Sequence, residues 1–175
     1  MMTMTTTAIH LEARGFVPNN PRLPLVLYQA AFPAVAEDLA AEMERRFAEN
    51  GWPPQWRNGI YDFDHYHTQG HEVLGIAAGS AELVLGGEGG RRIEVSAGDV
   101  LLLPAGTGHR CLRHSGDFLV VGAYPPGQSA DIVRKEATQA MLKQIAVLSF
   151  PASDPVQGAD GPITRLWADQ MLRNR

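Results

Sequence analysis

The sequence has a single cysteine, no long apolar run and no excess of basic residues. Cys111 cannot form an intramolecular disulfide, which favours a reducing, cytoplasmic setting. The longest apolar stretches, such as residues 100–105, are much shorter than the ~20 residues that a membrane helix needs. The net charge of -4 gives no electrostatic reason to expect nucleic acid as a partner. We therefore expect a soluble protein that binds neither membrane nor nucleic acid.

The two ends of the chain lack recognisable functional signals. Residues 1–10 have no positively charged region followed by an apolar core, so they do not form a secretory signal, and residues 1–15 are expected to be a flexible N-terminus. The basic tail contains Arg165, Arg173 and Arg175 and is too narrow for a phosphate-binding face. Residues 16–175 have the length of one domain with its own hydrophobic core.

Glycine and proline are abundant, with 18 and 12 residues. This content is too high for a helical bundle and is typical of a chain with many turns. Between about residues 52 and 128, short apolar or alternating runs are separated by glycine-containing turns. Such regular spacing predicts a β sandwich or barrel. Residues 25–28 form a further apolar run, which we interpret as a strand.

Helical patterns flank this β region. Residues 33–51 begin with a proline, place acids early and arginines late, and end at Asn-Gly. A second helical pattern covers roughly residues 134–148, and a short helix is expected around residues 163–172. One apolar face of each of the first two patterns is expected to pack on the β core. These faces comprise Val35, Leu39, Met43 and Phe47 in the first pattern and Ala137, Met141, Ile145 and Leu148 in the second.

Three histidines and a glutamate fall within residues 65–72. His65 and His67 are two positions apart, so on a strand they project from the same face, whereas on a helix they would diverge. The aromatic residues before them favour the strand. After the turn at residues 68–70, either His71 or Glu72 faces the same interior, because neighbouring strand residues point to opposite sides.

A further histidine follows a buried run. Residues 100–103 form an apolar strand, Pro104 ends it, and a glycine-rich turn leads to His109 at the start of the next strand. A side chain at that position can reach the interior that His65 and His67 face. For the remaining histidines, His10 and His114, we expect ordinary hydrogen-bonded or surface positions.

Together, residues 59–79 and 98–113 resemble the two sequence motifs of the cupin superfamily. The residues that match the first motif are Gly59, His65, His67, Glu72 and Gly79, and those that match the second are Gly98, Pro104, Gly106 and His109. Arg113 stands where the second motif often has asparagine, which weakens analogies of substrate but not of metal. The flanking segments also resemble a group of single-domain bacterial cupins, the YjlB-like cupins, and that group implies no firm activity.

The resemblance implies a mostly β chain with the cupin double-stranded β-helix, a jelly-roll-like barrel, an N-terminal helix and a C-terminal helical extension. It also implies one divalent transition metal ion per chain, held by His65, His67, Glu72 and His109. Three imidazoles and a carboxylate suit Fe, Mn, Ni, Zn or Co, and the sequence does not choose among them. A homodimer is expected by the same analogy, paired through the strand at residues 25–28 or other exposed sheet edges.

Strand alternation suggests which residues surround the metal. Counting in twos back from His65 and forward from His109 gives the tentative substrate contacts Phe63, Tyr61, Arg57, Cys111 and Arg113. Two arginines beside a metal would suit an anionic small molecule. The alternatives are that Arg57 is solvated, that Tyr61 belongs to the core and that Cys111 is a small buried filler.

Three functions fit these residues. The first is a metal-dependent oxygenase of a small organic acid or similar anionic substrate, which would use the two coordination positions that four protein ligands leave open on an octahedral ion. The second is a metal-dependent isomerase or epimerase acting on a sugar or sugar acid. The third is a non-catalytic metal or small-molecule binding module, in which the ion braces the fold. We favour an enzyme, because all four ligand positions are filled.

Overall fold

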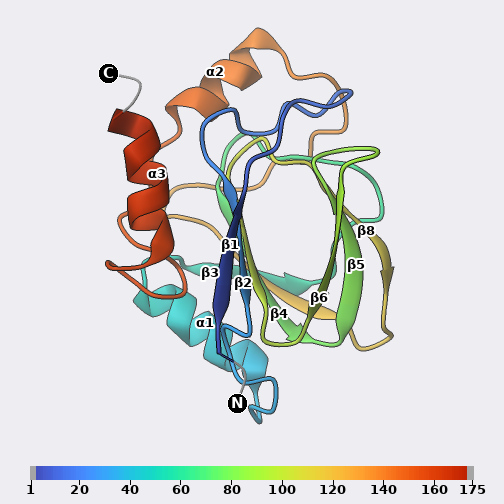
Figure 1. The fold of residues 1–175 in the computed structure, drawn as a ribbon, viewed down its shortest axis with the longest axis vertical. Coiled ribbons are helices and arrows are strands. Elements are labelled where there is room, and N and C mark those ends of the chain that lie inside the picture. Colours follow the sequence, from blue (N-terminus) through green and yellow to red (C-terminus); the bar gives the residue numbers. More distant parts are fainter. Residues whose placement is uncertain (1–2, 173–175) are drawn as a thin grey trace.

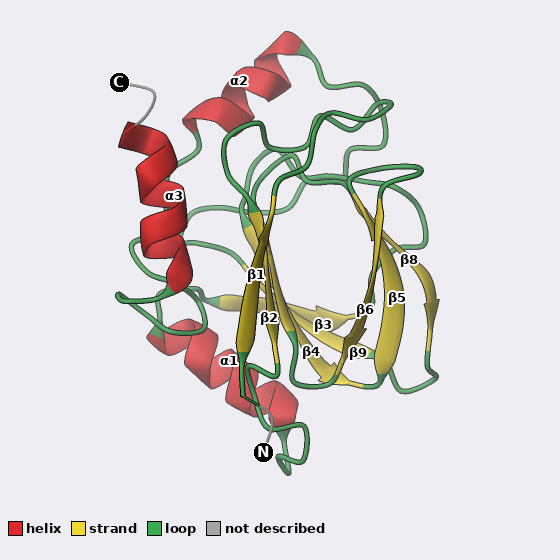
Figure 2. Ribbon diagram, viewed as in Figure 1, coloured by secondary structure: helices red, strands yellow, loops and turns green. Residues whose placement is uncertain are grey.

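The computed structural model describes residues 3–172, which form two facing antiparallel sheets with helices on the outside (Figure 1). The larger sheet has the strand order β1-β2-β7-β4-β9-β3 and the smaller sheet β6-β5-β8, and Figure 2 shows the open sandwich that they make. The predicted mostly β cupin architecture is confirmed, although the described strands remain two sheets and do not close into one barrel. The strands are β1 Thr5–Ile9, β2 Leu25–Gln29, β3 Pro54–Asn58, β4 Glu72–Ala78, β5 Ser80–Leu85, β6 Arg91–Ser96, β7 Val100–Leu103, β8 His109–His114 and β9 Leu119–Ala123.

The larger sheet is buried on both faces because its strands carry apolar residues at consecutive positions. Leu25 and Leu27 of β2 belong to the core between the sheets, whereas Val26 and Tyr28 belong to a second core under the helices. The strand β7 divides its apolar residues in the same way, and all four of them are buried. This alternation follows from the twofold repeat of strand side chains, and it explains how the larger sheet contributes to two hydrophobic cores, one on each face.

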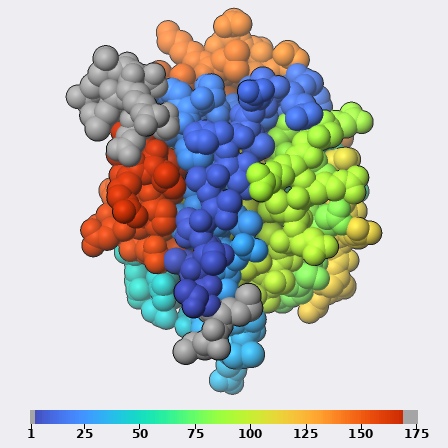
Figure 3. Space-filling view, in the orientation of Figure 1, coloured from blue at the N-terminus to red at the C-terminus, as the bar shows by residue number. Residues whose placement is uncertain are grey.

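The N-terminal segment, which was expected to be flexible, contains a strand at residues 5–9. The strand β1 pairs with β2 in register from Thr5 opposite Gln29 to Ile9 opposite Leu25. Figure 3 shows this dark blue segment lying across the surface between α3 and the green strands. Its three consecutive threonines are β-branched and favour extended backbone. Since β2 lies between β1 and β7, the strand at residues 25–28 has no free edge for the predicted dimer contact.

The first helix, α1, spans Leu39–Glu49 and begins later than predicted. The carboxylate of Asp38 accepts a hydrogen bond from the Ala41 amide at 3.1 Å and so caps the helix at this point. Val35 therefore lies outside the helix and is 93% exposed, which corrects its predicted packing role. The other residues of the predicted face, Leu39, Met43 and Phe47, are buried against the larger sheet.

The two C-terminal helices are α2, Gln139–Val147, and α3, Pro162–Leu172. Thr138 caps α2, which shortens the predicted helix, and Ile145 is its buried anchor. In α3, Trp167 packs into the core under the larger sheet. Arg173 and Arg175 of the basic tail lie outside the described residues. Within the described residues, neither these helices nor α1 is long and apolar enough to cross a membrane.

Candidate metal centre

The two histidine motifs meet because His65 and His109 pair through their backbones. The His65 amide donates to the His109 carbonyl at 3.3 Å, and the His109 amide donates to the His65 carbonyl at 3.0 Å. This bridge places the two imidazole centroids 4.1 Å apart. The regular strand predicted before His65 does not form, since only His65 and Tyr66 make isolated bridges between β3 and β4. Two residues of extended backbone are enough to direct both imidazoles of the first motif inward.

The second imidazole, that of His67, is positioned by a segment more than sixty residues away. Its Nδ1 atom lies 2.5 Å from the Asp131 carbonyl oxygen. The Asp131 carboxylate in turn accepts hydrogen bonds from the Thr68 amide at 2.7 Å, the Thr68 hydroxyl at 2.5 Å and the Gln69 amide at 3.2 Å. Asp131 therefore fixes both the histidine and the turn that follows it, and no sequence pattern indicated this role.

The third imidazole depends on the turn between β7 and β8. Gly106 has a φ of 91°, which favours glycine, and its amide donates to the His67 carbonyl at 2.8 Å. The Ala105 amide donates to Nδ1 of His71 at 3.0 Å. The turn between β7 and β8 is thus hydrogen-bonded to the residues on both sides of the turn at 68–70, and His109 follows it as the first residue of β8.

The three histidines form a buried cluster whose ligand atoms all lie within 4.8 Å of one another. Each Nδ1 atom faces a backbone carbonyl oxygen, which accepts a hydrogen and does not donate one. These carbonyls belong to Phe63, Asp131 and Thr107, at 3.0, 2.5 and 2.9 Å from His65, His67 and His109. Because Nδ1 must carry the hydrogen, the Nε2 lone pairs of the neutral rings are free. This is the tautomer and orientation that a metal ion requires, so the residues fit the ion that the cupin motifs imply.

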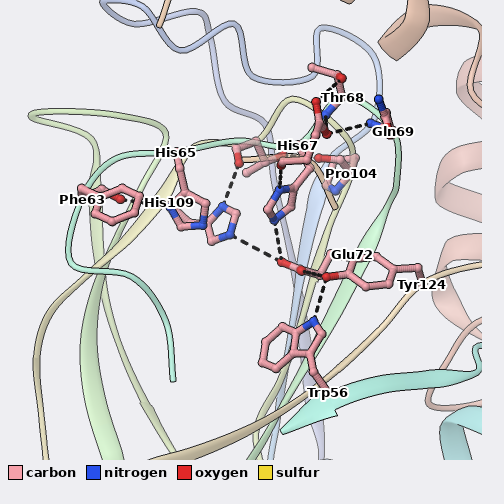
Figure 4. A network of polar contacts seen from close by, with 12 residues as sticks. Trp56, Phe63, His65, His67, Thr68, Gln69, Glu72, Pro104, His109 and Tyr124 are labelled. Carbon is pink, nitrogen blue, oxygen red and sulfur yellow. Dashed lines mark hydrogen bonds and ion pairs between the residues drawn. The ribbon is translucent and has the colours of Figure 1, made fainter. Parts of the chain in front are cut away.

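Glu72, the first residue of β4, lies beside the cluster (Figure 4). Its Oε1 atom is 3.3 Å from Nε2 of His67 and 3.5 Å from Nε2 of His109. Its Oε2 atom accepts the hydroxyl hydrogen of Tyr124 at 2.6 Å, and the Trp56 indole donates to that hydroxyl at 2.8 Å. Oε2 is therefore fixed by the Tyr124 hydroxyl, and Oε1 faces the imidazoles.

The electrostatics of the cluster favour a neutral His65 and an ionised Glu72. Burial lowers the pKa of His65 to about 3, and His109 beside it lowers the pKa further. Burial also opposes a charge on His67, but the adjacent Glu72 outweighs it and raises the pKa of that imidazole. Burial alone would raise the pKa of Glu72, yet His67 and His109 hold it well below its usual range. The negative charge of Glu72 beside the imidazole nitrogens fits a metal ion, which would neutralise it.

His71 points away from the cluster, which resolves the choice between His71 and Glu72. Its ring lies 4.9 Å from the Trp167 ring of α3, within the core on the outer side of the larger sheet. Burial lowers its pKa to about 4. Its Nε2 atom is buried and has no hydrogen-bond partner among residues 3–172. His71 thus braces the turn at Ala105 from the side opposite the cluster.

The cluster forms one wall of a cavity of about 550 Å³ between the sheets, which is the size of many small-molecule sites. Trp56, Tyr61 and Tyr124 also line it. Tyr61 is 53% exposed and marks the outer part of the cavity. A small molecule in this space can therefore reach the imidazoles and Glu72 directly.

The two arginines predicted to contact substrate lie elsewhere. The Arg57 guanidinium pairs with Glu44 of α1, with its Nε atom 3.0 Å from a carboxylate oxygen. Arg113 is exposed at the far end of β8 and pairs with Glu82 of β5. Neither arginine lines the cavity. Trp56, which precedes Arg57, faces the cavity instead, because the chain between β3 and His65 is not a strand and counting in twos fails across it.

The other three predicted contacts divide between the cavity and the core. Tyr61 lines the cavity, as predicted from its position before His65. Phe63 is partly buried behind it, with the two rings stacked at 4.8 Å, and does not line the cavity. Cys111 is buried in the core between the sheets, so the alternative of a small filler is correct. Trp56, Tyr124 and Asp131 are the functional candidates that the sequence did not reveal.

Comparison with known proteins places the chain in a family. The Cupin domain family model matches residues 54–121. The chain is 37% identical over 155 residues to the uncharacterized protein YjlB of Bacillus subtilis (strain 168), a match that covers 87% of this chain and 91% of that protein. The chain therefore belongs to the cupin superfamily. Within it, the chain falls in the YjlB-like group, as the flanking segments predicted.

Two solved structures show weaker similarity. A DUF861 family protein of Thermotoga maritima is 22% identical, with a TM-score of 0.32, and the match covers 46% of this chain and 86% of that protein. A conserved protein of unknown function from Streptococcus pyogenes is 12% identical, with a TM-score of 0.26, over 71% of this chain and 75% of that one. The family assignment does not depend on either.

Proposed function

We propose that the chain binds one divalent transition metal ion through His65, His67, His109 and Glu72, and that it acts on a small molecule in the adjacent cavity. The observation that carries this proposal is the orientation of the three imidazoles. Every Nδ1 atom is bound to a backbone carbonyl, so every Nε2 lone pair is available at one buried point. Such supporting contacts are characteristic of metal-binding histidines.

When bound, an ion with this nitrogen–oxygen ligand set supplies open coordination positions for a substrate oxygen and for dioxygen, and Fe, Mn, Ni, Zn and Co all suit the set. The contribution of the chain is to hold the ligands and shape the cavity. Tyr124 fixes one carboxylate oxygen of Glu72, and Trp56 fixes Tyr124. The three imidazoles are buried and line the inner part of the cavity.

Among the three predicted activities, an oxygenase fits the cavity best. An isomerase or epimerase needs a side chain that removes a proton and returns it. Outside the ligand set, the ionisable side chains that line the cavity, among the described residues, are Tyr61 and Tyr124. Tyr124 directs its hydrogen at Glu72, and burial with that carboxylate nearby raises its pKa. The binding-module alternative has less support, because the cavity gives a small molecule direct access to the ligand atoms.

Metal content tests the proposal. Untagged protein would be purified without added metal, reconstituted with one equivalent of Fe(II) under anaerobic conditions, desalted and analysed for metal. We expect about one ion per chain in the wild type and less than a tenth of that in His65→Ala and His109→Ala. His114→Ala is the matched control, because that histidine is exposed and outside the cluster. Full occupancy in both cluster variants, with circular dichroism showing folded protein, would refute the ligand set.

A second measurement separates an oxygenase from a binding module. Nitric oxide is a probe for a coordination position that dioxygen can reach. We expect iron-loaded protein treated with nitric oxide to give the electron paramagnetic resonance signal of a high-spin iron nitrosyl. Loaded protein that gives no such signal has no accessible position, and the ion would then only brace the fold.

The assembly and location of the protein remain predictions. We propose a homodimer in the cytoplasm, in keeping with the cupin family and the single cysteine. The strand β2 cannot mediate the dimer, and β1 offers an edge of the larger sheet in its place. Sedimentation equilibrium at two protein concentrations would distinguish a dimer from a monomer.

A further inference from the structure

We propose that the cavity selects a ligand that is uncharged outside its metal-binding atoms and that carries a flat, aromatic part. This inference rests on the proposed function for the identity of the cavity as the substrate site. It replaces the anionic substrate that the sequence suggested. Three features of the structure support it: the chemistry of the cavity wall, the engagement of the nearby arginines and an aromatic stack that ends in the cavity.

The cavity wall lacks fixed charge outside the metal cluster. Among the described residues that line it there is no lysine, arginine or aspartate, and the only glutamate is Glu72. The wall combines apolar surface with neutral hydrogen-bonding groups. The apolar surface comes chiefly from Trp56, Ile60, Leu74 and Ile132, and the neutral polar groups from Gln55, Asn58, Gln128 and Ser129.

Three arginines on strands that border the cavity are paired with carboxylates. Arg57 and Arg113 pair with Glu44 and Glu82, as described above. Arg110 lies on β8 next to His109, and its Nε atom is 3.5 Å from a carboxylate oxygen of Asp64. An anionic ligand would therefore have to break an existing ion pair to recruit one of these three guanidinium groups.

The fourth arginine, Arg134, takes part in the aromatic stack. Its guanidinium lies 3.7 Å from the centroid of the Phe63 ring, and the Tyr61 ring stacks on the same phenylalanine at 4.8 Å. Since two groups cannot share one face of a ring, Arg134 and Tyr61 occupy the two faces of Phe63. Tyr61 is thus the last member of the stack, and it is half exposed and lines the cavity. It offers aromatic surface to a flat ligand.

The cost of desolvation determines which ligands the cavity can bind. A charged group that leaves water and gains no partner of opposite charge pays a large penalty, whereas an amide or hydroxyl group can recover its hydrogen bonds from neutral side chains. Apart from the metal and its ligands, the described residues that line the cavity offer only the second kind of partner. An anionic donor atom on the ligand could bind the ion, but the rest of the molecule meets apolar and neutral polar surface.

Binding of matched probes to metal-free protein tests this inference. Benzamide and benzoate have the same flat shape and differ in charge. At pH 8 we expect benzamide to shift the backbone amide resonances of Asn58, Gly59 and Ser129 in a nuclear magnetic resonance titration. Benzoate is expected to bind at least about tenfold more weakly. Equal binding of benzoate at these residues, or no shift by benzamide, would overturn the inference.

A designed charge sharpens the test. Ile132 lines the cavity and is 45% exposed, so Ile132→Arg places an unpaired guanidinium at its rim. We expect this variant to prefer benzoate over benzamide, and Ser129→Arg to do the same from a second lining position. Val147→Arg on α2 is the control, because Val147 is exposed and does not line the cavity. An unchanged preference in both rim variants would contradict the inference.

These outcomes are distinguishable from failure of the metal proposal. The probe titrations use metal-free protein, so they can succeed even if the chain takes up no ion. Conversely, normal metal content with equal binding of benzamide and benzoate would remove the inference about charge and leave the metal centre intact.

Discussion

Tyr124 directly follows β9, which neighbours β4 in the larger sheet, and donates its hydroxyl hydrogen to the Oε2 atom of Glu72 across 2.6 Å. The same hydroxyl accepts a hydrogen bond from the Trp56 indole at 2.8 Å. The carboxylate is therefore fixed through one oxygen before any metal binds, and its Oε1 atom is left 3.3 Å from Nε2 of His67. Such preorganisation reduces the entropy that the ligand must lose on binding.

Removal of this hydroxyl should weaken metal binding without unfolding the protein. Tyr124→Phe keeps the ring but leaves Glu72 free to rotate, so we expect the dissociation constant of the metal to rise by about 10- to 100-fold. A competition titration against a chromophoric chelator measures this change. The control is Tyr61→Phe, because Tyr61 lines the same cavity without contacting Glu72. Wild-type affinity in Tyr124→Phe would mean that Glu72 does not depend on this contact.

The sequence predicted that His65, His67 and His109 meet, and it could do so because the determinants of this cluster are local. His65 and His67 needed only two residues of extended chain, and Gly106 needed only a turn that glycine allows. The surrounding contacts could not be predicted in the same way. Asp131 and Tyr124 reach the cluster through the order of the strands and through a long loop, and neither has a periodic pattern near the histidines.

The incorrect predictions share a physical cause, which is extrapolation of a regular repeat across irregular backbone. Arg57 was placed in the cavity by counting from His65 through residues 59–64, which are not a strand. Val35 was placed on a helix that in fact starts at Leu39, after the Asp38 cap. The threonines of β1 give no alternating apolar pattern that would predict a strand, because β1 lies at an edge and its side chains are mostly exposed. Pairing with β2 orders them, and pairing is a property of the whole sheet.

The turn at Gly106 offers a test of how His109 is positioned. A Cβ atom at Gly106 would lie 2.8 Å from the Asn19 carbonyl oxygen, and its φ of 91° is unfavourable for alanine. We expect Gly106→Ala to lower the free energy of unfolding by about 1–3 kcal/mol and to reduce metal affinity, because the turn must shift. Gly116→Ala is the control, since no atom lies within 4 Å of its Cβ position. Urea denaturation and metal titration would measure both effects, and wild-type values for Gly106→Ala would show that the turn tolerates the strain.

The contact between Tyr28 and Asp154 tests the attachment of the C-terminal segment to the sheet. The Tyr28 hydroxyl donates to a carboxylate oxygen of Asp154 at 2.6 Å, and both residues are fully buried. The other oxygen accepts hydrogen bonds from the amides of Val156 and Gln157. Tyr28→Phe leaves a buried carboxylate short of one donor, so we expect a loss of about 2–3 kcal/mol in urea denaturation. An effect below about 0.5 kcal/mol would show that water replaces the hydroxyl.

His71 gives the protein a pH-dependent stability that metal-free samples should reveal. Burial lowers the pKa of its imidazole from 6.5 to about 4 in the folded chain. Between these two values the unfolded chain binds a proton that the folded chain does not, so acidification favours unfolding. The stability that His71 contributes is complete above pH 6.5 and is lost as the pH falls towards 4. The difference corresponds to roughly 3 kcal/mol for this one group.

The measurement compares the wild type with His71→Asn, both stripped of metal, by urea denaturation at several pH values between 7 and 4.5. The asparagine Oδ1 atom can accept the Ala105 amide hydrogen that Nδ1 of His71 accepts, and it does not titrate. We expect the variant to lose less stability on acidification, so that the gap between the two proteins narrows or reverses as the pH falls. Because His65 and His67 titrate in both proteins, their contributions cancel in the comparison. Parallel pH profiles would show that His71 is protonated equally in the folded and unfolded chains, and hence that its buried ring reaches solvent or a proton donor.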